Sequence, residues 1–202
     1  MPQHRIGSQT IGFSRSPRIL ASAAVVGPKE GKGPLGNQFD FVLPDALYGK
    51  SSYEQAEQAM MQEACNRCLG KARLASTDVQ ALLGGDLLNQ IMAASIAARE
   101  LGTPFLGLYG ACSTMAESLC LGAMLVDGGH MRNALCAASS HFCTAERQYR
   151  FPLEYGAQRT PTAQWTVTGA GATLISSARG VKPIARCTLA TLGTVTDLGI
   201  AD

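Results

Sequence analysis

Hydrophobic residues occur in short continuous runs that alternate with longer stretches of helical periodicity. The apolar runs lie at 18–26, 79–83, 104–109 and 134–139, and glycine or small polar residues follow them. Runs of this length are typical of strands that are buried on both faces of a parallel sheet. We therefore predict a strand at each of these positions, with Phe105 to Leu108 buried on both faces.

Between these predicted strands, apolar residues recur with the periodicity of a helix. One apolar stripe over 52–74 recurs every four residues and consists of Ala56, Met60, Ala64, Cys68 and Ala72. A capping box at Ser51-Ser52-Tyr53-Glu54 is expected to start this helix. The same periodicity predicts helices over 87–101 and 112–127, and Gly128-Gly129 is a helix-stop signal.

The order of these elements defines the fold class. A further strand is expected at 165–176, which gives the order βαβαβαββ, and another at 184–196, in the same sheet or in an adjoining layer. Such an order predicts an α/β fold with a mostly parallel sheet and helices on both faces. We expect a flexible arm over 1–17 and a single domain over 18–202. Long loops are expected at 27–50 and 140–164.

Composition supports one compact domain and excludes several classes of protein. The chain has 202 residues, of which 46% are hydrophobic and 16% charged, with 22 glycines and a net charge of +2. The basic residues are scattered along the sequence, so we expect no nucleic-acid partner. No apolar run reaches the roughly 20 residues of a membrane-spanning helix, and the run at 19–26 is at the short limit for a signal peptide.

The cysteines argue against a disulfide framework and against a metal. There are seven of them, an odd number, and several lie in apolar runs, which favours a reducing compartment. Cys65 and Cys68 form a CxxC motif, but it falls within a predicted helix and has no second pair. We therefore expect neither a metal nor a cofactor.

Cys112 is the main candidate for chemistry. It follows an elbow at Tyr109-Gly110-Ala111 and begins the helix predicted over 112–127. Unpaired N–H groups and the positive end of the helix dipole favour a thiolate or a bound anion at such a position. The alternative is that Cys112 is a small buried residue, which is common for a free cysteine.

Small polar residues follow three of the predicted strands. Because the carboxyl ends of parallel strands share one edge of the sheet, we expect these residues to converge on one crevice. An alternative is that Asp86 and Ser139 merely cap turns and helices. The candidate ligand-binding residues are Asp86, Asn89, Cys112, Ser113, Thr114, Ser140 and His141.

Several longer motifs carry a resemblance to known proteins. They are Val26-Gly27-Pro28, Gly33-Pro34-Leu35-Gly36, Gly85-Asp86-Leu87-Leu88-Asn89-Gln90, 107–114, Ser139-Ser140-His141, Cys143-Thr144-Ala145-Glu146 and 161–171. On these residues the chain resembles the thiolase superfamily, and within it the stage V sporulation AD family of spore-forming bacteria. The resemblance covers the chain from about residue 18 to its end. Members of that family are longer, so the resemblance implies that this chain holds the amino-terminal half of a thiolase-like fold.

The resemblance also implies a function and partners. It implies binding of pyridine-2,6-dicarboxylate (dipicolinic acid), free or as a calcium chelate, and a role in its uptake into the developing spore and its release at germination. The partners it implies are the other stage V sporulation A proteins at a membrane and a second copy in a homodimer. The implied location is cytoplasmic, peripheral to the spore inner membrane.

Binding and catalysis remain as competing hypotheses. A Cys-dependent acyltransferase or ketoacyl synthase would use Cys112 as nucleophile and His141 as its partner, but this sequence lacks the second acid–base group that the chemistry requires.

Binding a planar dianion needs only N–H donors and a cation, for which the candidates are Arg147, Arg150 and Arg159. Tyr109 or Trp165 is a candidate to flank the ring, with a core position as the alternative for each. Asp86 would repel a free dianion and attract a calcium chelate. We favour binding.

Overall fold

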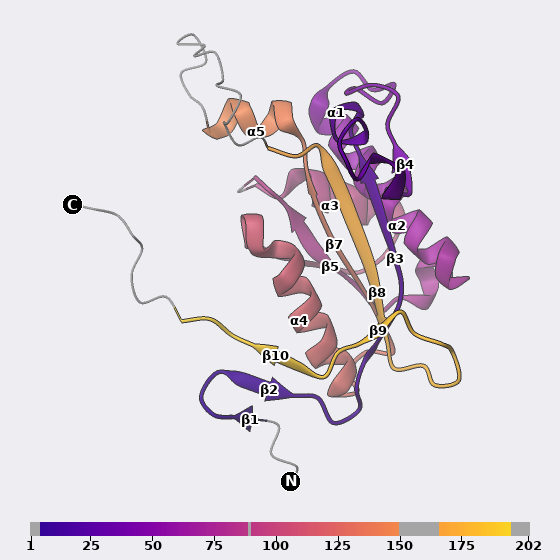
Figure 1. Ribbon diagram of the computed structural model, residues 1–202, viewed down its shortest axis with the longest axis vertical. Coiled ribbons are helices and arrows are strands. Elements are labelled where there is room, and N and C mark those ends of the chain that lie inside the picture. Colours follow the sequence, from indigo (N-terminus) through magenta and orange to yellow (C-terminus); the bar gives the residue numbers. More distant parts are fainter. Residues whose placement is uncertain (1–4, 89, 150–165, 195–202) are drawn as a thin grey trace, which may run out of the picture.

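A single mixed sheet forms the centre of the protein (Figure 1). The computed structural model describes residues 5–88, 90–149 and 166–194. In spatial order the strands are β4, β3, β8, β7, β5 and β6, and β9 pairs with the beginning of β3 on the side away from β8. Their bounds are β3 Arg18–Val26, β4 Phe41–Val42, β5 Ala81–Asp86, β6 Phe105–Gly107, β7 Asn133–Ser140, β8 Gly169–Ser176 and β9 Ala185–Arg186.

The sheet is mostly parallel, as predicted, with one long exception. Strand β5 pairs in parallel with both β6 and β7, and β3 pairs in parallel with β4. Strand β8 runs antiparallel between β3 and β7. The carboxyl ends of β3, β5, β6 and β7 therefore share one edge of the sheet with the beginning of β8. We call this the carboxyl edge and the opposite one the amino edge.

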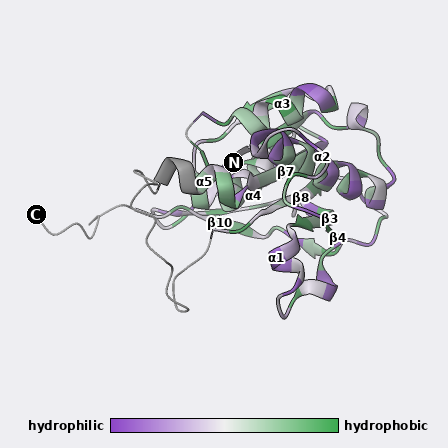
Figure 2. Ribbon diagram, turned by 90° about the horizontal axis from the view of Figure 1, so that it is seen from above, coloured by the Kyte–Doolittle hydropathy of each residue, from purple (hydrophilic) through white to green (hydrophobic). Residues whose placement is uncertain are grey.

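Helices cover both faces, which confirms the predicted layers. Helices α2 (Tyr53–Ala72) and α3 (Met92–Leu101) pack on one face, and α4 (Thr114–Asp127) packs on the other. Figure 2 shows the hydrophobic colour concentrated on the strands, while hydrophilic colour gathers on the outer turns of α2 and α3. None of the helices within the described ranges is long and apolar enough to cross a membrane.

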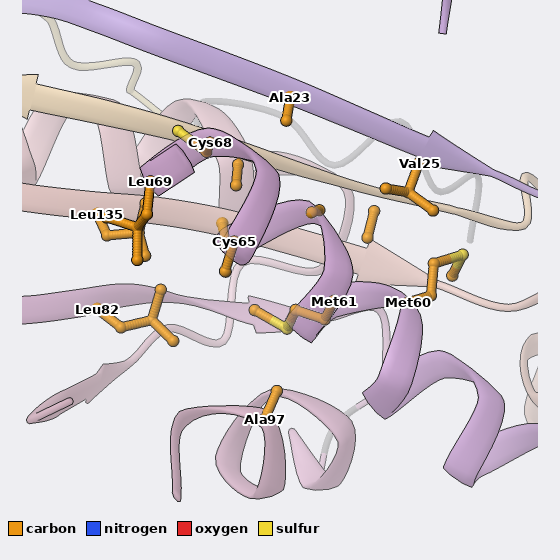
Figure 3. Packing of buried hydrophobic residues seen from close by; sticks show 14 of the residues in the cluster. Ala23, Val25, Met60, Met61, Cys65, Cys68, Leu69, Leu82, Ala97 and Leu135 are labelled. Atoms are coloured by element: carbon orange, nitrogen blue, oxygen red, sulfur yellow. The ribbon is translucent and has the colours of Figure 1, made fainter. Parts of the chain in front are cut away.

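The largest part of the core lies between α2 and the sheet (Figure 3). Met60, Met61 and Cys65 of α2 are completely buried against strand residues such as Leu82 and Leu135. Burying each large apolar side chain contributes roughly 1.5–3 kcal/mol. The facing strand positions are rich in alanine, so the helix can lie close to the sheet.

The amino end of α2 is capped one residue later than predicted. The N-cap is Ser52, whose Oγ accepts a hydrogen bond from the backbone N–H of Gln55. The side chain of Gln55 reaches back and accepts hydrogen bonds from Ser51, the role that the sequence pattern gave to Glu54. Glu54 lies in the first turn, where an acidic residue favours the helix dipole.

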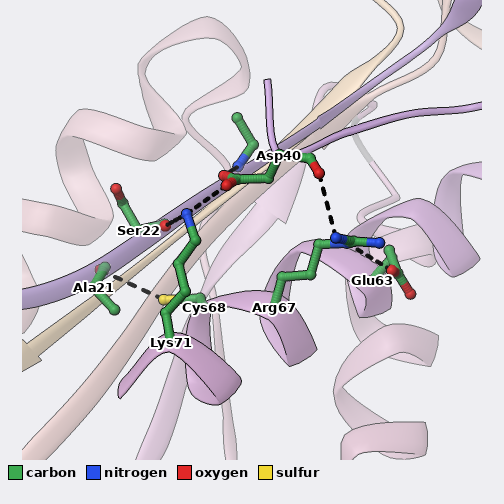
Figure 4. A network of polar contacts seen from close by, with 8 residues as sticks. Ala21, Ser22, Asp40, Glu63, Arg67, Cys68 and Lys71 are labelled. Carbon is green, nitrogen blue, oxygen red and sulfur yellow. Dashed lines mark hydrogen bonds and ion pairs between the residues drawn. The ribbon is translucent and has the colours of Figure 1, made fainter. Parts of the chain in front are cut away.

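Polar contacts tie the carboxyl half of α2 to β3 and to the segment before β4 (Figure 4). The carboxylate of Asp40 accepts a hydrogen bond from the backbone N–H of Ala24 and forms an ion pair with Lys71. Lys71 Nζ also donates to the carbonyl oxygen of Ser22, 2.8 Å away. Arg67 pairs with Glu63 one turn earlier on the same helix.

Strand β6 is not the doubly buried strand that the sequence predicted. It is the last strand of the sheet and has a neighbour on one side only, so the side chain of Leu106 is 44% exposed. The helix expected to begin at residue 87 begins at Met92, and Ile91, directly before it, has a positive φ.

The segments expected to lack regular structure contain short elements. Residues 5–12, in the expected flexible arm, form the hairpin β1 (Arg5–Ile6) and β2 (Thr10–Gly12), which pairs with β10 (Leu189–Thr191). The strand expected over 184–196 is therefore divided between β9 and β10, which belong to different sheets. The loop expected at 27–50 contains α1 (Pro28–Gly31), the 3-10 turn η1 (Gly36–Gln38) and β4, and α5 (Phe142–Tyr149) follows β7.

Substitution of Gly84 tests the close approach of β5 and β7. A Cβ at this position would lie 2.0 Å from the carbonyl oxygen of Ala137, so Gly84→Ala must push the two central strands apart. We expect it to lower the free energy of unfolding by about 2 kcal/mol or more in urea denaturation. The control is Gly70→Ala on exposed α2, where a Cβ has open space and should stabilise by about 0.5–1 kcal/mol. Equal stability of the two variants would contradict the packing described.

Candidate functional site

Two of the predicted polar residues meet at the carboxyl edge. Asp86 ends β5, and Ser139 lies beside it as its pairing partner on β7. Both side chains are buried. The neighbouring residues Ser140 and His141 follow directly at the end of β7, so this end of the strand carries three consecutive polar side chains.

Asp86 holds the turn between β5 and α3. Its Oδ1 accepts a hydrogen bond from the N–H of Leu88 at 3.1 Å, and its Oδ2 accepts one from the N–H of Ala94 at 3.0 Å. Burial raises the pKa of this carboxyl, and the backbone hydrogen bonds act in the opposite direction. This geometry matches the capping role that we considered as the alternative, while contact with a ligand stays a prediction.

Glu57 is a buried acid that the sequence analysis did not identify. It lies on the amino-terminal half of α2 and points toward the end of β7, where its Oε1 accepts a hydrogen bond from Ser139 Oγ at 3.0 Å. Its Oε2 lies 3.1 Å from Thr144 Oγ1. The sequence does contain a signal, because Glu57, Met60, Met61 and Ala64 share the spacing of one helix face.

Burial makes Glu57 retain its proton to a higher pH than an ordinary carboxyl group. Desolvation and then the nearby charge of Asp86 raise its pKa to about 7, against the lowering effect of the two hydroxyl groups. Thr144 Oγ1 also lies 2.9 Å from the carbonyl oxygen of His141, and a hydroxyl has one hydrogen to donate. When Thr144 donates to that carbonyl, a protonated Glu57 donates to Thr144, and every group in the chain is satisfied.

His141 is held in one tautomer inside the protein. The side chain is 1% exposed, and its ring lies against that of Tyr53 with the centroids 5.1 Å apart. Its Nδ1 accepts a hydrogen bond from the N–H of Cys143, so Nε2 carries the hydrogen and donates to the carbonyl oxygen of Ala46 at 2.8 Å. Both ring nitrogens are therefore engaged within the fold.

A small cavity of about 110 Å³ opens beside His141. Its lining residues follow β3, β4 and β7 or directly precede β8, and they include Glu30, Phe142 and Thr168. Glu30 Oε1 accepts a hydrogen bond from the N–H of Thr168, and its buried Oε2 has no hydrogen-bond partner among the described residues. One residue that lines the cavity thus has a buried carboxylate oxygen whose hydrogen-bonding capacity is unused within the described structure.

Cys112 lies on the surface, as the prediction of a reactive position requires. It is exposed within the 3-10 turn η3 (Ala111–Ser113), directly before α4. Ala111 has a φ of +44°, a left-handed conformation that is uncommon for a residue with a side chain. The backbone thus turns sharply at this residue and presents the thiol at the amino end of a 14-residue helix.

The neighbours of Cys112 divide between surface and interior. Ser113 is exposed, and its Oγ donates to the carbonyl oxygen of Gly110. Thr114 is buried, and its Oγ1 has no hydrogen-bond partner among the described residues. Glu117 lies in the first turn of α4, with its carboxylate close to Gly110, and already contributes negative charge at the helix start.

The two halves of the predicted site lie on different faces of the sheet. Asp86 and Ser139 bond to elements on the α2–α3 face, and His141 stacks on Tyr53 of α2. Cys112 begins the helix that covers the opposite face. Ser140 donates to the carbonyl oxygen of Val167, just before β8. Within the described ranges, no hydrogen bond joins the Cys112 side chain to either group.

Several of the predicted site residues lie outside the part of the chain that the structure describes. Asn89, Arg150, Arg159 and Trp165 lie outside the described residues, as does the side chain of Arg147. Tyr109 is 72% exposed, so it does not belong to the core. Among the residues that the structure describes, no group of three or more histidine, cysteine, aspartate or glutamate side chains is arranged to hold a metal ion.

Comparison with known proteins identifies the family. The sequence profile of stage V sporulation protein AD (SpoVAD) matches residues 7–202. The chain is 46% identical, over 196 residues, to the stage V sporulation protein AD of Bacillus subtilis. It belongs to the SpoVAD family. The match covers 97% of this chain and 57% of the Bacillus protein, so the chain spans little more than half of that relative's length.

Solved structures place this SpoVAD-family chain in the thiolase-like fold. Xanthomonas campestris OleA (variant H285N) aligns with a TM-score of 0.55 at 15% identity, over 80% of this chain and 56% of OleA. The 3-oxoacyl-[acyl-carrier-protein] synthase III of Aquifex aeolicus aligns with a TM-score of 0.51 at 14% identity, over 79% and 53% of the two chains. At this identity the likeness concerns the fold alone, and it confirms the predicted fold class.

The buried acid makes stability depend on pH. Because the pKa of Glu57 is raised from 4.5 to about 7 in the folded state, its stabilising contribution is complete below pH 4.5 and is lost as the pH rises to about 7. This shift in the pKa of Glu57 corresponds to a change of about 3 kcal/mol in the free energy of unfolding over this pH range. We expect Glu57→Gln to flatten this part of the profile, measured by urea denaturation between pH 4.5 and 8. Glu63→Gln, on the surface of the same helix, should leave the slope unchanged, whereas parallel profiles for the wild type and Glu57→Gln would refute the assignment.

Proposed function

We propose that this chain is the amino-terminal, ligand-binding part of a sporulation protein that binds dipicolinate without catalysing acyl transfer. The observation that carries the proposal is its 46% identity, over nearly its whole length, to a stage V sporulation protein. In this proposal it acts in the uptake of dipicolinate into the developing spore and its release at germination. Its partners are the membrane proteins of the same stage, beside the spore inner membrane.

The surface at the start of α4 supports binding of an anion. Cys112 and Ser113 are exposed there, directly before the amino end of the 14-residue helix α4. The first N–H groups of a helix favour a carboxylate, and a planar dicarboxylate offers one at each end. Glu117 works against a free dianion at this helix start, and a calcium chelate, which carries less negative charge, would meet less repulsion.

The state of His141 supports binding over catalysis. A general base for Cys112 needs an imidazole nitrogen that can take the thiol proton, within hydrogen-bond reach. Both nitrogens of His141 are engaged with backbone groups on the α2 side of the sheet. The alternative function as a Cys-dependent acyltransferase has one observation in its favour, which is the exposed Cys112 at a sharp elbow.

Calorimetry with dipicolinate tests the proposed ligand. We expect saturable heat with a dissociation constant in the micromolar range or weaker, and a several-fold loss of affinity in Ser113→Ala. The matched control is Ser177→Ala, an exposed serine at the amino edge, which should bind like the wild type. Titrations with and without calcium separate the free dianion from the chelate. No heat from this chain and none from the full-length Bacillus relative would contradict the proposal.

Mass spectrometry tests the acyltransferase alternative. After incubation with acyl-coenzyme A we expect no increase in mass at Cys112, although brief alkylation at pH 8 should label this exposed thiol. Cys68 and Cys136 serve as internal controls, because burial raises the pKa of each thiol to about 12 and shields both from reagent. An acyl-thioester that forms on the wild type and not on Cys112→Ser would favour the enzyme.

A further inference from the structure

Basic side chains gather at the amino edge of the sheet, away from the candidate site. Arg18 begins β3, Arg132 directly precedes β7, and Arg179 follows β8. These three strands are neighbours in the sheet, so their ends at this edge lie side by side. We use the name amino-edge patch for the following set: Arg15, Arg18, Arg132, Arg179, Lys182 and Arg186.

Several of these cations are held close together by the backbone. Arg18 and Arg186 are direct partners in the antiparallel pairing of β3 with β9, where like charges destabilise each other. Arg18 Nη1 donates to the carbonyl oxygen of Ala178, and the carbonyl oxygen of Arg132 accepts from the N–H of Ser177. The fold therefore places like charges close together at this edge, and a bound anion would reduce the repulsion between them.

Carboxylates compensate this charge only in part. Two acidic residues near the beginnings of the central strands at this edge are Asp78 and Asp127, and Asp127 is buried with its oxygens accepting from backbone N–H groups of Ser14 and Arg15. Within the described ranges the ion pairs use Arg67, Lys71 and Arg99, so no member of the amino-edge patch is neutralised by one. The whole chain carries a net charge of only +2, which makes the concentration of positive charge here a local feature.

Aliphatic side chains lie exposed among these cations. The connection from β8 to β9, residues 177–184, extends away from the body of the protein (Figure 1). In it Val181 is 54% exposed and Ile184 is 64% exposed. Arg179 and Lys182 flank Val181 in the sequence and are themselves exposed. The loop therefore presents apolar side chains within a cationic surface.

We propose that the amino-edge patch binds the surface of an anionic phospholipid bilayer. Lipid phosphates neutralise the arginine and lysine side chains, while Val181 and Ile184 enter the boundary between headgroups and acyl chains. A nucleic acid would satisfy the cations equally well, but it offers no apolar medium for the two aliphatic side chains. The exposure of Val181 within the loop and of Ile184 directly before β9 is what favours a bilayer.

This contact orients the protein on the membrane. Because the amino and carboxyl edges are opposite ends of the sheet, a bilayer at the amino-edge patch leaves the carboxyl edge facing the aqueous side. The inference adds a specific surface to the proposed peripheral location. It does not use the dipicolinate site, so lipid binding and dipicolinate binding can succeed or fail separately.

Vesicle sedimentation with the 202-residue chain tests the proposal. We expect binding to vesicles of phosphatidylglycerol and phosphatidylcholine in 50 mM salt, weaker binding in 500 mM salt, and none to pure phosphatidylcholine. Each cation near an anionic surface accounts for a factor of about five in affinity, so Arg179→Gln/Lys182→Gln should weaken binding about 25-fold. Val181→Asn, added to the wild type or to the double variant, should weaken vesicle binding without changing its dependence on salt.

Matched substitutions at the carboxyl edge supply the controls. Lys32→Gln/Lys50→Gln removes the same charge from exposed positions near that edge, and Leu35→Asn replaces an aliphatic residue with similar exposure to Val181. Both control variants should bind vesicles like the wild type, and thermal unfolding verifies that all variants fold. The proposal is overturned if the two double variants bind alike, if neutral and anionic vesicles bind alike, or if duplex DNA of equal phosphate concentration displaces the vesicles.

Discussion

The close packing of α2 on the sheet is the constraint on which the other features of this protein depend. The helix buries methionine and cysteine side chains against strand positions that are mostly alanine, so its axis lies near the strands. The same closeness carries the next residue of that helix face, Glu57, into the interior at the ends of β5 and β7. A buried carboxyl needs partners, and Ser139 and Thr144 supply them. Packing energy from the apolar part of α2 thus determines which polar groups must be present at the carboxyl edge.

The elements that could be predicted from the sequence are those with strong local patterns. The apolar run of β3 and the periodicity of α2 gave nearly the observed bounds, and β7 was correct within a residue. The hairpin β1–β2 and its pairing with β10 depend on residues almost 180 positions apart, and no local pattern reports such a pairing. Strand β6 was misjudged because its composition is that of a central strand, whereas its exposure depends on its place at the end of the sheet order.

The local elements of the candidate site could be predicted from the sequence, but their positions relative to one another could not. The elbow before α4 and the polar ends of β5 and β7 follow from sequence pattern, and the structure places each where a parallel sheet requires. Their separation onto two faces could not be predicted, because it depends on the side to which each helix returns. Asp86 and His141 look alike in sequence as free polar residues, yet the fold engages both with backbone groups. Cys112 and Ser113 are exposed, while the polar groups beneath α2 stabilise the ends of β5 and β7.

The antiparallel direction of β8 connects the two ends of the molecule. In a fully parallel sheet every strand would begin at the amino edge and end at the carboxyl edge, so an additional strand would need a crossover helix. Strand β8 instead starts beside the end of β7 and returns to the amino edge, where the chain turns through residues 177–184 into β9. Because β8 runs in this direction, Thr168, directly before it, lines the cavity at the carboxyl edge. The residues after β8 form the basic loop at the amino edge. Since the two surfaces share a rigid strand, a protein held at one edge keeps the other at a fixed distance and orientation.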